Sequence, residues 1–520
     1  LAALLSLVSF AVSKSFNFSL ICFKNHVFSR VWIRPKYFEF KRSDGRGFAI
    51  GEKISLIALR ESVDELENRY RSDGFFLVRV FIPPQEVTDG IFTIKVIEGF
   101  IESAFAEGGN EVGRRRVESI LSPVIMKKPI DLPTLERVLL LLNDLPGISG
   151  SGILRQGEKL GGSQLIITLN TLPPKSFTTS INNSASKTMG LWSTNLNTTL
   201  NNPFNFVSST FGIGVSASIK NNNLRAYNTS YAQAIGNKGL IFSFAGLLAD
   251  AEPKGSLKPL AIVSKSYSLA PRLRYPIKRS RLESQYFELG LTNGKSKTTL
   301  QSNAITVDKS TVLDMVFSIQ SNEWFDANTE INFSIFRGLD IFGSLDKNAD
   351  TPSVANFTQK FNKFKFNIKQ TLPLDKNSLT LKILLQSQWT NDKLLAGEQI
   401  SFGGPIIGRG YDGGAIAGDK GFGLSMELTK KLLNNPIRIL KDSNFEFYCF
   451  LDYAEARSLA DVTNSGDSKN SYLGSHGLGI RINDMTGFSL DLMAAEARNT
   501  FSGSDVRENP RYILSLTKSF

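Results

Sequence analysis

The residues most suggestive of chemistry stand in the stretch FGGPIIGRGYDGG, residues 402 to 414. Gly408, Gly410 and Gly413 form a G-x-G-x-x-G pattern, which can hold a dinucleotide pyrophosphate when a strand precedes it and a helix follows. Such a site also needs an acidic residue about 20 positions further on. Here the residues that follow alternate as a strand, and position 433 is Leu. The sequence therefore argues against a nucleotide site.

Metal-binding and acyl-transfer chemistry has few residues to draw on. The chain contains two cysteines, Cys22 and Cys449, and two histidines, His26 and His476. Structural zinc sites, disulfide frameworks and Ser-His or Cys-His relays depend on these residue types. The sequence predicts no enzyme activity, no metal and no cofactor, which leaves the glycine-rich stretch to be explained by the elements that position it.

Composition favours a protein with a large apolar surface. The 520 residues include 38 Phe against 12 Tyr and 4 Trp, a balance that suits a membrane-facing surface. The net charge of +12 could serve nucleic acid, an anionic membrane or an acidic partner. Lys and Arg are scattered, however, with no basic run longer than Arg114 to Arg116. A nucleic-acid partner is therefore not expected.

The first residues form an apolar run, LAALLSLVSFAV, at positions 1 to 12. This run is too short to cross a bilayer as a helix, which takes about 20 residues, but it has the length of a signal-peptide core. We interpret residues 1–36 as a possible truncated signal peptide and N-terminal segment, which would imply export. A misplaced start of the reading frame is the alternative.

Residues up to about 170 mix helical and strand periodicities. A helix is predicted over 56–74, closing on a glycine, and two strands should follow in FFLVRVFIPP and IFTIKVIEG. A second set comprises a strand over 101–106, helices over 111–121 and 131–147, and strands over 148–156 and 163–170. The apolar faces proposed for the first and last helices are Ile57, Val63, Leu66 and Tyr70, and Leu132, Leu135, Leu139 and Leu142. The first third is thus two small α+β units in tandem.

From residue 171 onward apolar and polar residues alternate, and helical periodicity all but disappears. About sixteen such segments fill roughly 350 residues, and an even number of strands is usual for bacterial outer-membrane barrels. A soluble sandwich would bury the apolar face, whereas a barrel turns it to lipid and lines its lumen with small and polar residues. Repeated Lys, Asp and Glu on the polar faces favour a mainly β protein with a 16-stranded antiparallel transmembrane barrel. Examples of the apolar face are Phe211, Ile213 and Val215; Phe364, Phe366 and Ile368; Phe445, Phe447, Cys449, Leu451 and Tyr453.

The C-terminus is typical of such a barrel. The last residues, YILSLTKSF, place four apolar side chains on one face, interrupted by Lys518. A final strand that ends in Phe resembles the assembly signal of bacterial outer-membrane barrels. The signal residues are Tyr512, Leu514, Leu516 and Phe520.

The glycine-rich stretch itself resembles the conserved loop of the two-partner secretion transporters, the TpsB family. In that family a long loop between the eleventh and twelfth barrel strands carries a G-G-x-x-x-V-R-G-Y/F motif and folds back into the lumen. Here the inward loop would span residues 393–420, and Gly408 stands where the family usually has Val. The matching motif residues are Gly403, Gly404, Arg409, Gly410 and Tyr411.

The resemblance also implies a partner for the loop arginine. The family pairs it with an Asp in the following strand, and Asp452 in CFLDYAEA matches that position. Strand alternation places Asp452 opposite Cys449 and Leu451, toward the lumen. A guanidinium suits such a clamp because its planar fork can hold a carboxylate bidentately and keeps its charge. An ordinary lumen Asp with an unrelated loop Arg is the alternative.

The stretch of residues 70–99 resembles the end of a POTRA domain of this family. Its P-x-Q-x-x-x-D-G core is carried here by Pro83, Gln85, Asp89, Gly90 and, at the end, Gly99. The resemblance implies a first POTRA domain at 37–100, shortened at its start, a second at 101–170, and the barrel at 171–520.

By resemblance, the protein would act in the outer membrane of a Gram-negative bacterium, with its POTRA domains in the periplasm. It would recognise an unfolded exoprotein of haemolysin or adhesin type by that partner's N-terminal secretion domain and pass it through the barrel. Outer-membrane lipid, lipopolysaccharide and the barrel assembly machinery are further expected partners. A barrel-assembly factor and a passive porin are the alternatives.

Overall fold

The structure is a computed structural model of all 520 residues, and it describes residues 55–86, 93–203, 208–219, 223–346, 351–375, 378–432, 443–459, 469–498 and 510–520. The expectations for residues 1–36, for the start of the first POTRA domain, and for Asp89 and Gly90 lie outside these residues. The chain divides into two compact units, residues 1–99 and 100–520, and each is described by itself.

The first unit packs one helix against a short hairpin. Helix α2 (Leu56–Ser72) begins because the Ser55 side chain accepts a hydrogen bond from the Ala58 backbone N–H, and it precedes strands β1 (Arg79–Phe81) and β2 (Lys95–Ile97). The strands pair antiparallel, and both are shorter than the sequence predicts. The core comprises Val63, Val78, Val80 and Ile94. Ile57 was wrongly assigned to this face, because it lies in the first turn and is 72% exposed.

The second unit begins with a three-stranded α+β domain. Its elements are β3 (Phe100–Glu107), α3 (Glu111–Leu121), the short 3-10 helix η1 (Ser122–Val124), α4 (Leu132–Asn143), β4 (Ile148–Gln156) and β5 (Gly162–Thr171). The sheet order is β3-β5-β4, with β3 and β5 parallel. Asn110 and Asp131 cap the two α-helices. The predicted helix over 131–147 is shorter in the structure, and Leu132 is exposed in its first turn.

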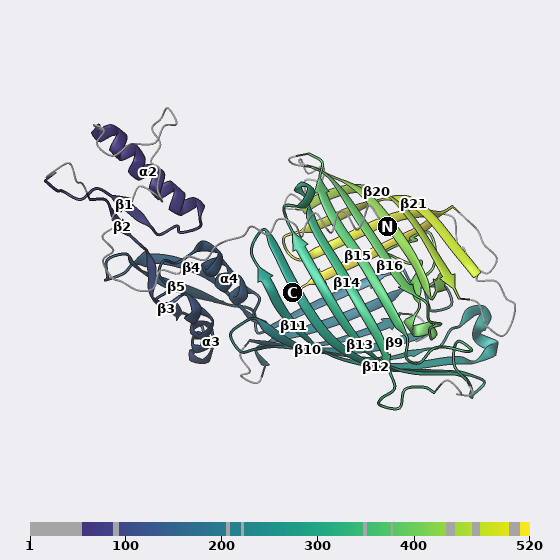
Figure 1. The fold of residues 1–520 in the computed structure, drawn as a ribbon. Coiled ribbons are helices and arrows are strands. Elements are labelled where there is room, and N and C mark those ends of the chain that lie inside the picture. Colours follow the sequence, from purple (N-terminus) through teal and green to yellow (C-terminus); the bar gives the residue numbers. More distant parts are fainter. Residues whose placement is uncertain are drawn as a thin grey trace. The chain divides into compact units, whose positions relative to one another are not determined.

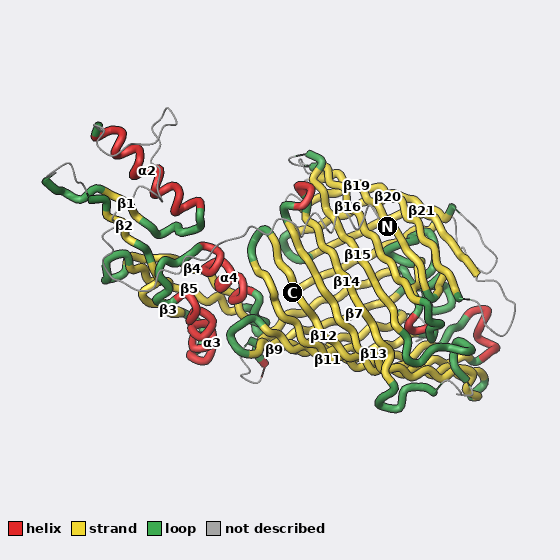
Figure 2. The backbone as a smooth tube through the Cα atoms, in the orientation of Figure 1, coloured by secondary structure: helices red, strands yellow, loops and turns green. Residues whose placement is uncertain are grey.

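Within the described residues, sixteen strands close into one antiparallel barrel, as the sequence predicts (Figures 1 and 2). The first and last strands, β6 and β23, pair with each other and complete the closure. The strands are β6 (Lys175–Asn182), β7 (Ser193–Asn201), β8 (Ser209–Ser218), β9 (Leu224–Ile235), β10 (Leu240–Ala251), β11 (Ile262–Arg279), β12 (Glu283–Leu300), β13 (Asn303–Ser321), β14 (Asn328–Leu339), β15 (Asn362–Pro373), β16 (Leu379–Thr390), β19 (Lys420–Lys431), β20 (Ser443–Ser458), β21 (Lys469–Asp484), β22 (Phe488–Ala497) and β23 (Arg511–Ser519). Short 3-10 helices lie at η3 (Gly255–Leu260) and η4 (Trp324–Asp326).

The two faces of the wall follow the alternation of the sequence. In β20, the exposed Leu451 and Tyr453 alternate with the buried Phe450 and Asp452. A strand turns successive side chains to opposite faces, so the exposed apolar side chains form the outer surface of the barrel. No helix among the described residues is long and apolar enough to cross a bilayer.

Side chains of the second α+β domain bind the barrel turn between β11 and β12. Arg279 donates to Asp144 from Nε at 2.7 Å and from Nη2 at 2.8 Å, which is a bidentate pair. Arg137 Nη2 donates to the Pro276 carbonyl oxygen at 2.8 Å. Bidentate and charge-assisted bonds fix orientation as well as distance, so this domain is held at one turn of the barrel.

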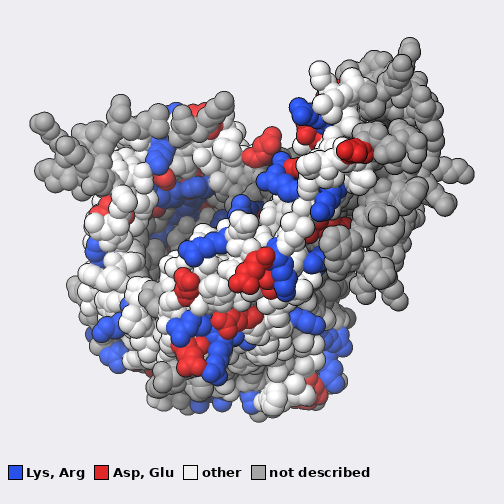
Figure 3. Space-filling model, turned by 90° about the vertical axis from the view of Figure 1, so that its left-hand side faces the viewer, with Lys and Arg blue, Asp and Glu red and all other residues white. Residues whose placement is uncertain are grey.

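Charged residues of both signs are intermixed on the face shown in Figure 3. Lys and Arg alternate there with Asp and Glu, and large white areas separate them. The excess of positive charge in the composition is therefore not gathered into one basic patch on the visible described surface.

Candidate functional site: the inward loop and its seat

The glycine-rich stretch lies in the connection between β16 and β19, the eleventh and twelfth strands of the barrel. The connection contains the 3-10 helix η5 (Ala396–Glu398) and a small antiparallel hairpin of β17 (Ile400–Phe402) and β18 (Ile416–Gly418). The tip of the loop, residues 403–415, joins the two hairpin strands. Its side chains pack on the inner face of the wall, opposite the exposed apolar surface.

Glycines allow the tip to fold tightly on itself. Gly403 and Gly404 have φ of +109° and +90°, a region that other residues rarely adopt. The Gly403 N–H donates to the Ile407 carbonyl oxygen at 2.9 Å, and the Gly404 N–H donates to the Tyr411 carbonyl oxygen at 3.0 Å. These bonds bring Arg409 to the end of the tip. Pro405 and Ile406 point away from the wall and are exposed.

Arg409 and Asp452 form a bidentate ion pair between the tip and β20. Arg409 Nε donates to Asp452 Oδ2 at 3.1 Å, and Nη2 donates to Oδ1 at 2.9 Å. Both side chains are buried, with exposures of 6% and 0%. The backbone N–H groups of Gly408 and Arg409 also donate to Asp452 Oδ2, each at 3.1 Å. The carboxylate therefore holds the backbone of the tip as well as its charge.

A second carboxylate completes the seat of the arginine. Arg409 Nη1 donates to Glu427 Oε2 of β19 at 2.8 Å, and Nη2 donates to Ser425 Oγ at 2.9 Å. The guanidinium lies 3.5 Å from the ring centroid of Phe450, a cation–π contact. A buried charge is costly unless it is paired and hydrogen-bonded, and here four side-chain bonds and one ring meet that condition.

Glu427 extends the seat into a network along the wall. Arg481 donates to both of its oxygens, at 2.5 and 3.1 Å, and Lys382 Nζ approaches at 3.3 Å. Arg481 Nε also donates to Asp491 at 2.9 Å, and the Tyr448 hydroxyl donates to the same carboxylate at 2.6 Å. Displacing Arg409 would therefore disturb the hydrogen bonding of strands β19 to β22.

Two further charged residues hold the neck of the loop. Asp419 is fully buried and accepts hydrogen bonds from the backbone N–H groups of Leu394 and Leu459, at 2.9 and 2.8 Å. Lys363, 3% exposed, donates to the carboxylate of Glu398 at 2.7 Å. The neck and the tip are thus fixed to the barrel independently.

The remaining motif residues of the tip pack against the wall. Tyr411 is fully buried, and its hydroxyl donates to the Gly474 carbonyl oxygen at 3.2 Å. A Cβ on Gly410 would come within 2.7 Å of the Ala497 backbone nitrogen, so only glycine allows this close approach. The apolar side of the tip is a cluster of Phe402, Ile407, Tyr411, Ile416, Ala454, Ala456 and Leu473.

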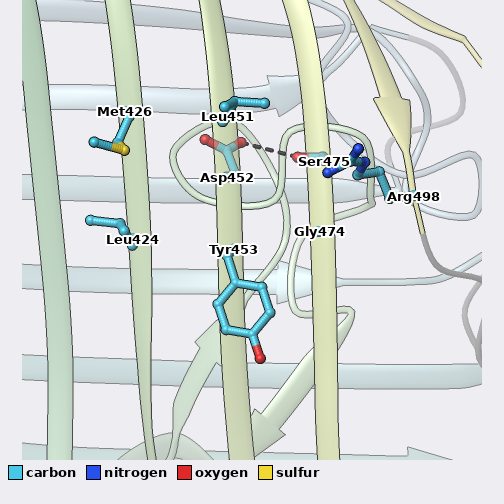
Figure 4. A pocket seen from close by; sticks show the side chains of 8 residues that line it. All are labelled: Leu424, Met426, Leu451, Asp452, Tyr453, Gly474, Ser475 and Arg498. Atoms are coloured by element: carbon cyan, nitrogen blue, oxygen red, sulfur yellow. Dashed lines mark hydrogen bonds between the residues drawn. The ribbon is translucent and has the colours of Figure 1, made fainter.

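The Asp452–Ser475 contact adjoins a hollow of 410 Å³ in the wall of β19, β20 and β21 (Figure 4). The Ser475 hydroxyl donates to Asp452 at 3.1 Å, and both residues line the hollow. The other lining residues are Leu424, Met426, Leu451, Tyr453, Gly474 and Arg498. The described residues also hold no cluster of three or more His, Cys, Asp and Glu that could bind a metal.

Three of the predicted POTRA motif residues, Pro83, Gln85 and Gly99, lie in the described part of the first unit. The Gln85 side-chain amide donates to the Thr93 carbonyl oxygen at 2.8 Å and accepts from the Thr93 N–H at 2.6 Å. This exchange resembles a pair of ladder bonds between strands. Gly99 is buried, and a Cβ there would lie 2.2 Å from that of Leu77. Pro83 precedes Gln85 in the same irregular segment.

Three of the predicted C-terminal signal residues, Tyr512, Leu514 and Leu516, lie on the last strand, β23, and Phe520 follows it directly. Tyr512 and Phe520 are 67% and 71% exposed, while Leu514 and Leu516 are partly buried. The Phe520 ring packs on that of Phe177 with 5.9 Å between centroids, and their backbones exchange hydrogen bonds. The chain end is therefore built into the closure of the barrel.

Sequence reasoning missed several residues of the seat. Alternation does place Glu427 opposite Met426 and Leu428, which would have assigned it to the lumen. Many lumen residues are charged, however, and nothing in the pattern distinguishes Glu427 or Arg481 from the others. The neck residue Asp419 had a weak signal, since it directly precedes the strand that the loop enters.

A closed sixteen-strand barrel with an inward loop seated on its wall, preceded by a POTRA-type domain, defines an outer-membrane barrel protein of the POTRA-containing class. Family models agree: the haemolysin secretion/activation family ShlB/FhaC/HecB matches residues 161–506, and the ShlB-type POTRA domain matches residues 46–99. The chain belongs to this family, the transporters of two-partner secretion, which act in the outer membrane with periplasmic POTRA domains and are not enzymes.

Relatives and solved structures agree with this assignment. The heme/hemopexin transporter protein HuxB of Haemophilus influenzae strain 86-028NP is 22% identical over 491 residues, covering 91% of this chain and 82% of HuxB. The haemolysin transporter protein HpmB of Proteus mirabilis is 23% identical, covering 71% of this chain and 65% of HpmB. The structure of CdiB from Escherichia coli has the same fold, with a TM-score of 0.73 at 18% identity, over 90% of this chain and 85% of CdiB.

Proposed function

We propose that the tip of the inward loop, residues 403–415, controls passage through the barrel, and that Arg409 holds it in place through Asp452 and Glu427. The observation that carries this proposal is the seating of one buried guanidinium on carboxylates of two neighbouring strands. An inward segment secured only by apolar contacts could slide, whereas bidentate bonds fix its register on the wall. The remaining motif residues, Gly403, Gly404, Gly410 and Tyr411, shape the tip.

The transported partner is a large exported protein that crosses the periplasm unfolded and presents an N-terminal secretion domain. In the second unit, β4 pairs only with β5 among the described residues, so one edge of this sheet is open to an added strand. Ile153 and Leu154 on β4 are 49% and 39% exposed. An extended peptide can add to such an edge by backbone hydrogen bonds, with exposed apolar side chains supplying further contact.

Transport then requires no nucleotide. The partner passes through the lumen as an extended chain, and folding outside the cell prevents its return. Outer-membrane lipid and lipopolysaccharide surround the exposed apolar face, and the barrel assembly machinery inserts the chain by its last strand, with Tyr512, Leu514, Leu516 and Phe520 as the signal. Gln85, Pro83 and Gly99 keep the first POTRA hairpin in shape for the partner, and Asp89 and Gly90 complete the POTRA motif in the sequence.

The test is Arg409→Ala in a strain that secretes the partner protein. Export should be lost or sharply reduced, while the variant barrel stays in the outer membrane and resists heat on gels as the unaltered barrel does. Arg274→Ala is the matched control, because Arg274 is a barrel arginine stacked on an aromatic ring, Tyr286, at 3.9 Å. Normal export by Arg409→Ala would contradict the proposed role of the loop.

The two alternative functions predict different effects of deleting the gene for this protein. A barrel-assembly factor would lower the amounts of many outer-membrane proteins, and a passive porin would change the uptake of small solutes without loss of any secreted protein. Loss of one large exported protein, with other barrels at normal levels, is the outcome that we expect.

A further inference from the structure

The loop tip also contacts the last strand of the barrel, through Arg511. This residue begins β23, and its side chain is 1% exposed. Arg511 Nη1 donates to the Tyr411 carbonyl oxygen, and Nη2 lies 3.4 Å from Asp412 Oδ1. Both partners belong to the tip, immediately after the Arg409 that is seated on β19 and β20. The tip therefore has a second charged anchor, three strands away from Asp452.

The same guanidinium also bonds the chain that leaves the first strand. Arg511 Nη2 donates to the Ser184 carbonyl oxygen at 2.6 Å, and Ser184 lies two residues beyond the end of β6. One side chain thus joins three parts of the molecule: the inward loop, the last strand and the segment after the first strand. This is the seam at which the barrel closes.

The seam is weakly paired at the end where Arg511 lies. In the described residues the β23–β6 ladder has five registered pairs, from Ser519↔Thr178 to Ser515↔Asn182, whereas the β6–β7 ladder has eight. Beyond Ser515 a backbone bond from the Asn183 N–H to the Leu514 carbonyl oxygen, at 3.2 Å, continues the pairing, and the Asn183 side chain adds to it. Its Oδ1 accepts from the Leu514 N–H at 2.8 Å, and its Nδ2 donates to the Tyr512 carbonyl oxygen at 3.1 Å. The contact between Arg511 and Ser184 lies beyond these bonds.

We propose that Arg511 is a positioning residue that couples the seat of the inward loop to closure of the seam. A guanidinium keeps its charge, and a buried charge must stay paired or reach water. When the tip leaves its seat, Arg511 loses the Tyr411 carbonyl and the Asp412 carboxylate together. It then turns toward water and releases the Ser184 carbonyl oxygen. The seam loosens at this end, which is opposite the end of β6 where the chain enters the barrel at Lys175. The inference deepens the function proposed above and rests on it for its role in transport.

The coupling can be measured by amide hydrogen exchange on the full chain in lipid nanodiscs. Peptides covering 177–186 and 511–519 report on the seam, and a peptide covering 403–415 reports on the tip. Four proteins are compared with the unaltered one: Arg409→Ala, Arg511→Ala, the double variant, and Arg225→Ala as a matched control. Arg225 lies on β9, three strands from β6, and its side chain is exposed.

Displacing the tip from its seat should speed amide exchange at the seam. Arg409→Ala should speed exchange in the tip and in both seam peptides by about tenfold or more, the effect expected when a charge-assisted hydrogen bond is lost. Arg511→Ala should do the same, and adding Arg409→Ala to it should change the seam no further. Arg225→Ala should leave all three peptides unchanged. If Arg511 only stabilised the fold, Arg409→Ala would speed amide exchange at the seam equally with and without Arg511.

Two outcomes would overturn the coupling. One is a tip that exchanges faster in Arg409→Ala while both seam peptides keep their original rates. The other is a seam effect of Arg409→Ala that persists in full in the double variant. Arg511→Lys guards against misfolding, since it keeps the charge but not the fork and should give an intermediate seam rate. Export is scored separately, so normal export by Arg409→Ala would refute the proposed function while the exchange data still decide the coupling.

Discussion

Replacing Gly408 by Val, the residue expected at this position from the family resemblance, should damage the loop of this protein. Gly408 has a φ of +89°, and a Cβ built there would lie 2.8 Å from Leu473 Cδ1 and 3.1 Å from the Gly403 Cα. A β-branched residue with positive φ is a rare and strained case. The Gly408 N–H also donates to Asp452, so a shift of the backbone at this position disturbs the ion pair directly.

The size of the effect can be worked out from these contacts. A non-glycine residue at positive φ costs about 1–3 kcal/mol, and forcing extra carbon atoms into a packed site costs about 1–3 kcal/mol more. Gly408→Val should therefore weaken the seated state by about 2–6 kcal/mol, which is at least about thirtyfold in the equilibrium between seated and displaced tip.

Three other glycine substitutions separate the backbone cost of positive φ from the cost of side-chain overlap. Gly413→Ala meets nothing within 4 Å and needs no positive φ, so it should be neutral. Gly414→Ala has φ of +73° and open space, so it should show the backbone cost alone. Gly408→Ala adds the contact with Leu473, and Gly408→Val adds branching.

The assay is protease cleavage or amide exchange of residues 403–415 in the full-length barrel, with export measured in parallel. The expected order of increasing tip exposure is Gly413→Ala, Gly414→Ala, Gly408→Ala and Gly408→Val. Combining Gly408→Val with Leu473→Ala should recover part of the loss by removing the side-chain overlap. If residues 403–415 of Gly408→Val resist cleavage and exchange as well as those of the unaltered chain, positive φ at residue 408 is not required and the reasoning fails.

Four further substitutions test the seat, the neck and the second α+β domain. Glu427→Gln removes the charge shared by two arginines and should raise tip exchange by an amount equivalent to about 1.5–3 kcal/mol, against about 1 kcal/mol for Ser425→Ala. Asp419→Ala leaves buried N–H groups without an acceptor, at about 1–3 kcal/mol each, and should lower the temperature at which the barrel unfolds on gels. Asp131→Ala should cost about 1 kcal/mol of α4 stability, measured by exchange of its amides in denaturant. Burial opposes ionisation of Asp131, but hydrogen bonds from Lys127 and Thr134 hold the pKa of its carboxyl below the usual value. The contribution of the cap is therefore full above the unfolded pKa of about 3.9 and is lost as the pH falls through the lowered folded value; equal stability at pH 6 and pH 2 would contradict it.

The barrel could be predicted from sequence because every strand follows the same physical rule. Lipid outside and water inside impose a period of two, and runs such as Phe364, Phe366 and Ile368 repeat that period often enough to count. Helix faces were less certain at their ends. Ile57 and Leu132 fit the helical spacing, but both lie in a first turn that extends beyond the packed core, and periodicity contains no information on where the neighbouring element stops.

The site was only partly predictable for a different reason. The motif and the family resemblance pointed to Arg409 and Asp452, and the structure places them in contact. Glu427 and Arg511 were not predicted, because each is a single charged residue whose role depends on what lies across the lumen or across the seam. Glu427 lies 18 positions and Arg511 lies 102 positions beyond Arg409 in the chain, and one sequence taken alone gives no sign of either pairing.

The exposed end of the loop tip can vary without loosening the seat. The seat is made by buried groups of the tip, whereas Pro405 and Ile406 are exposed, Ile406 with 57% of its surface. The side chains at these two positions take part in none of the bonds of the seat described above. Replacing them would change the surface that the tip presents while the bonds that hold the tip stay in place.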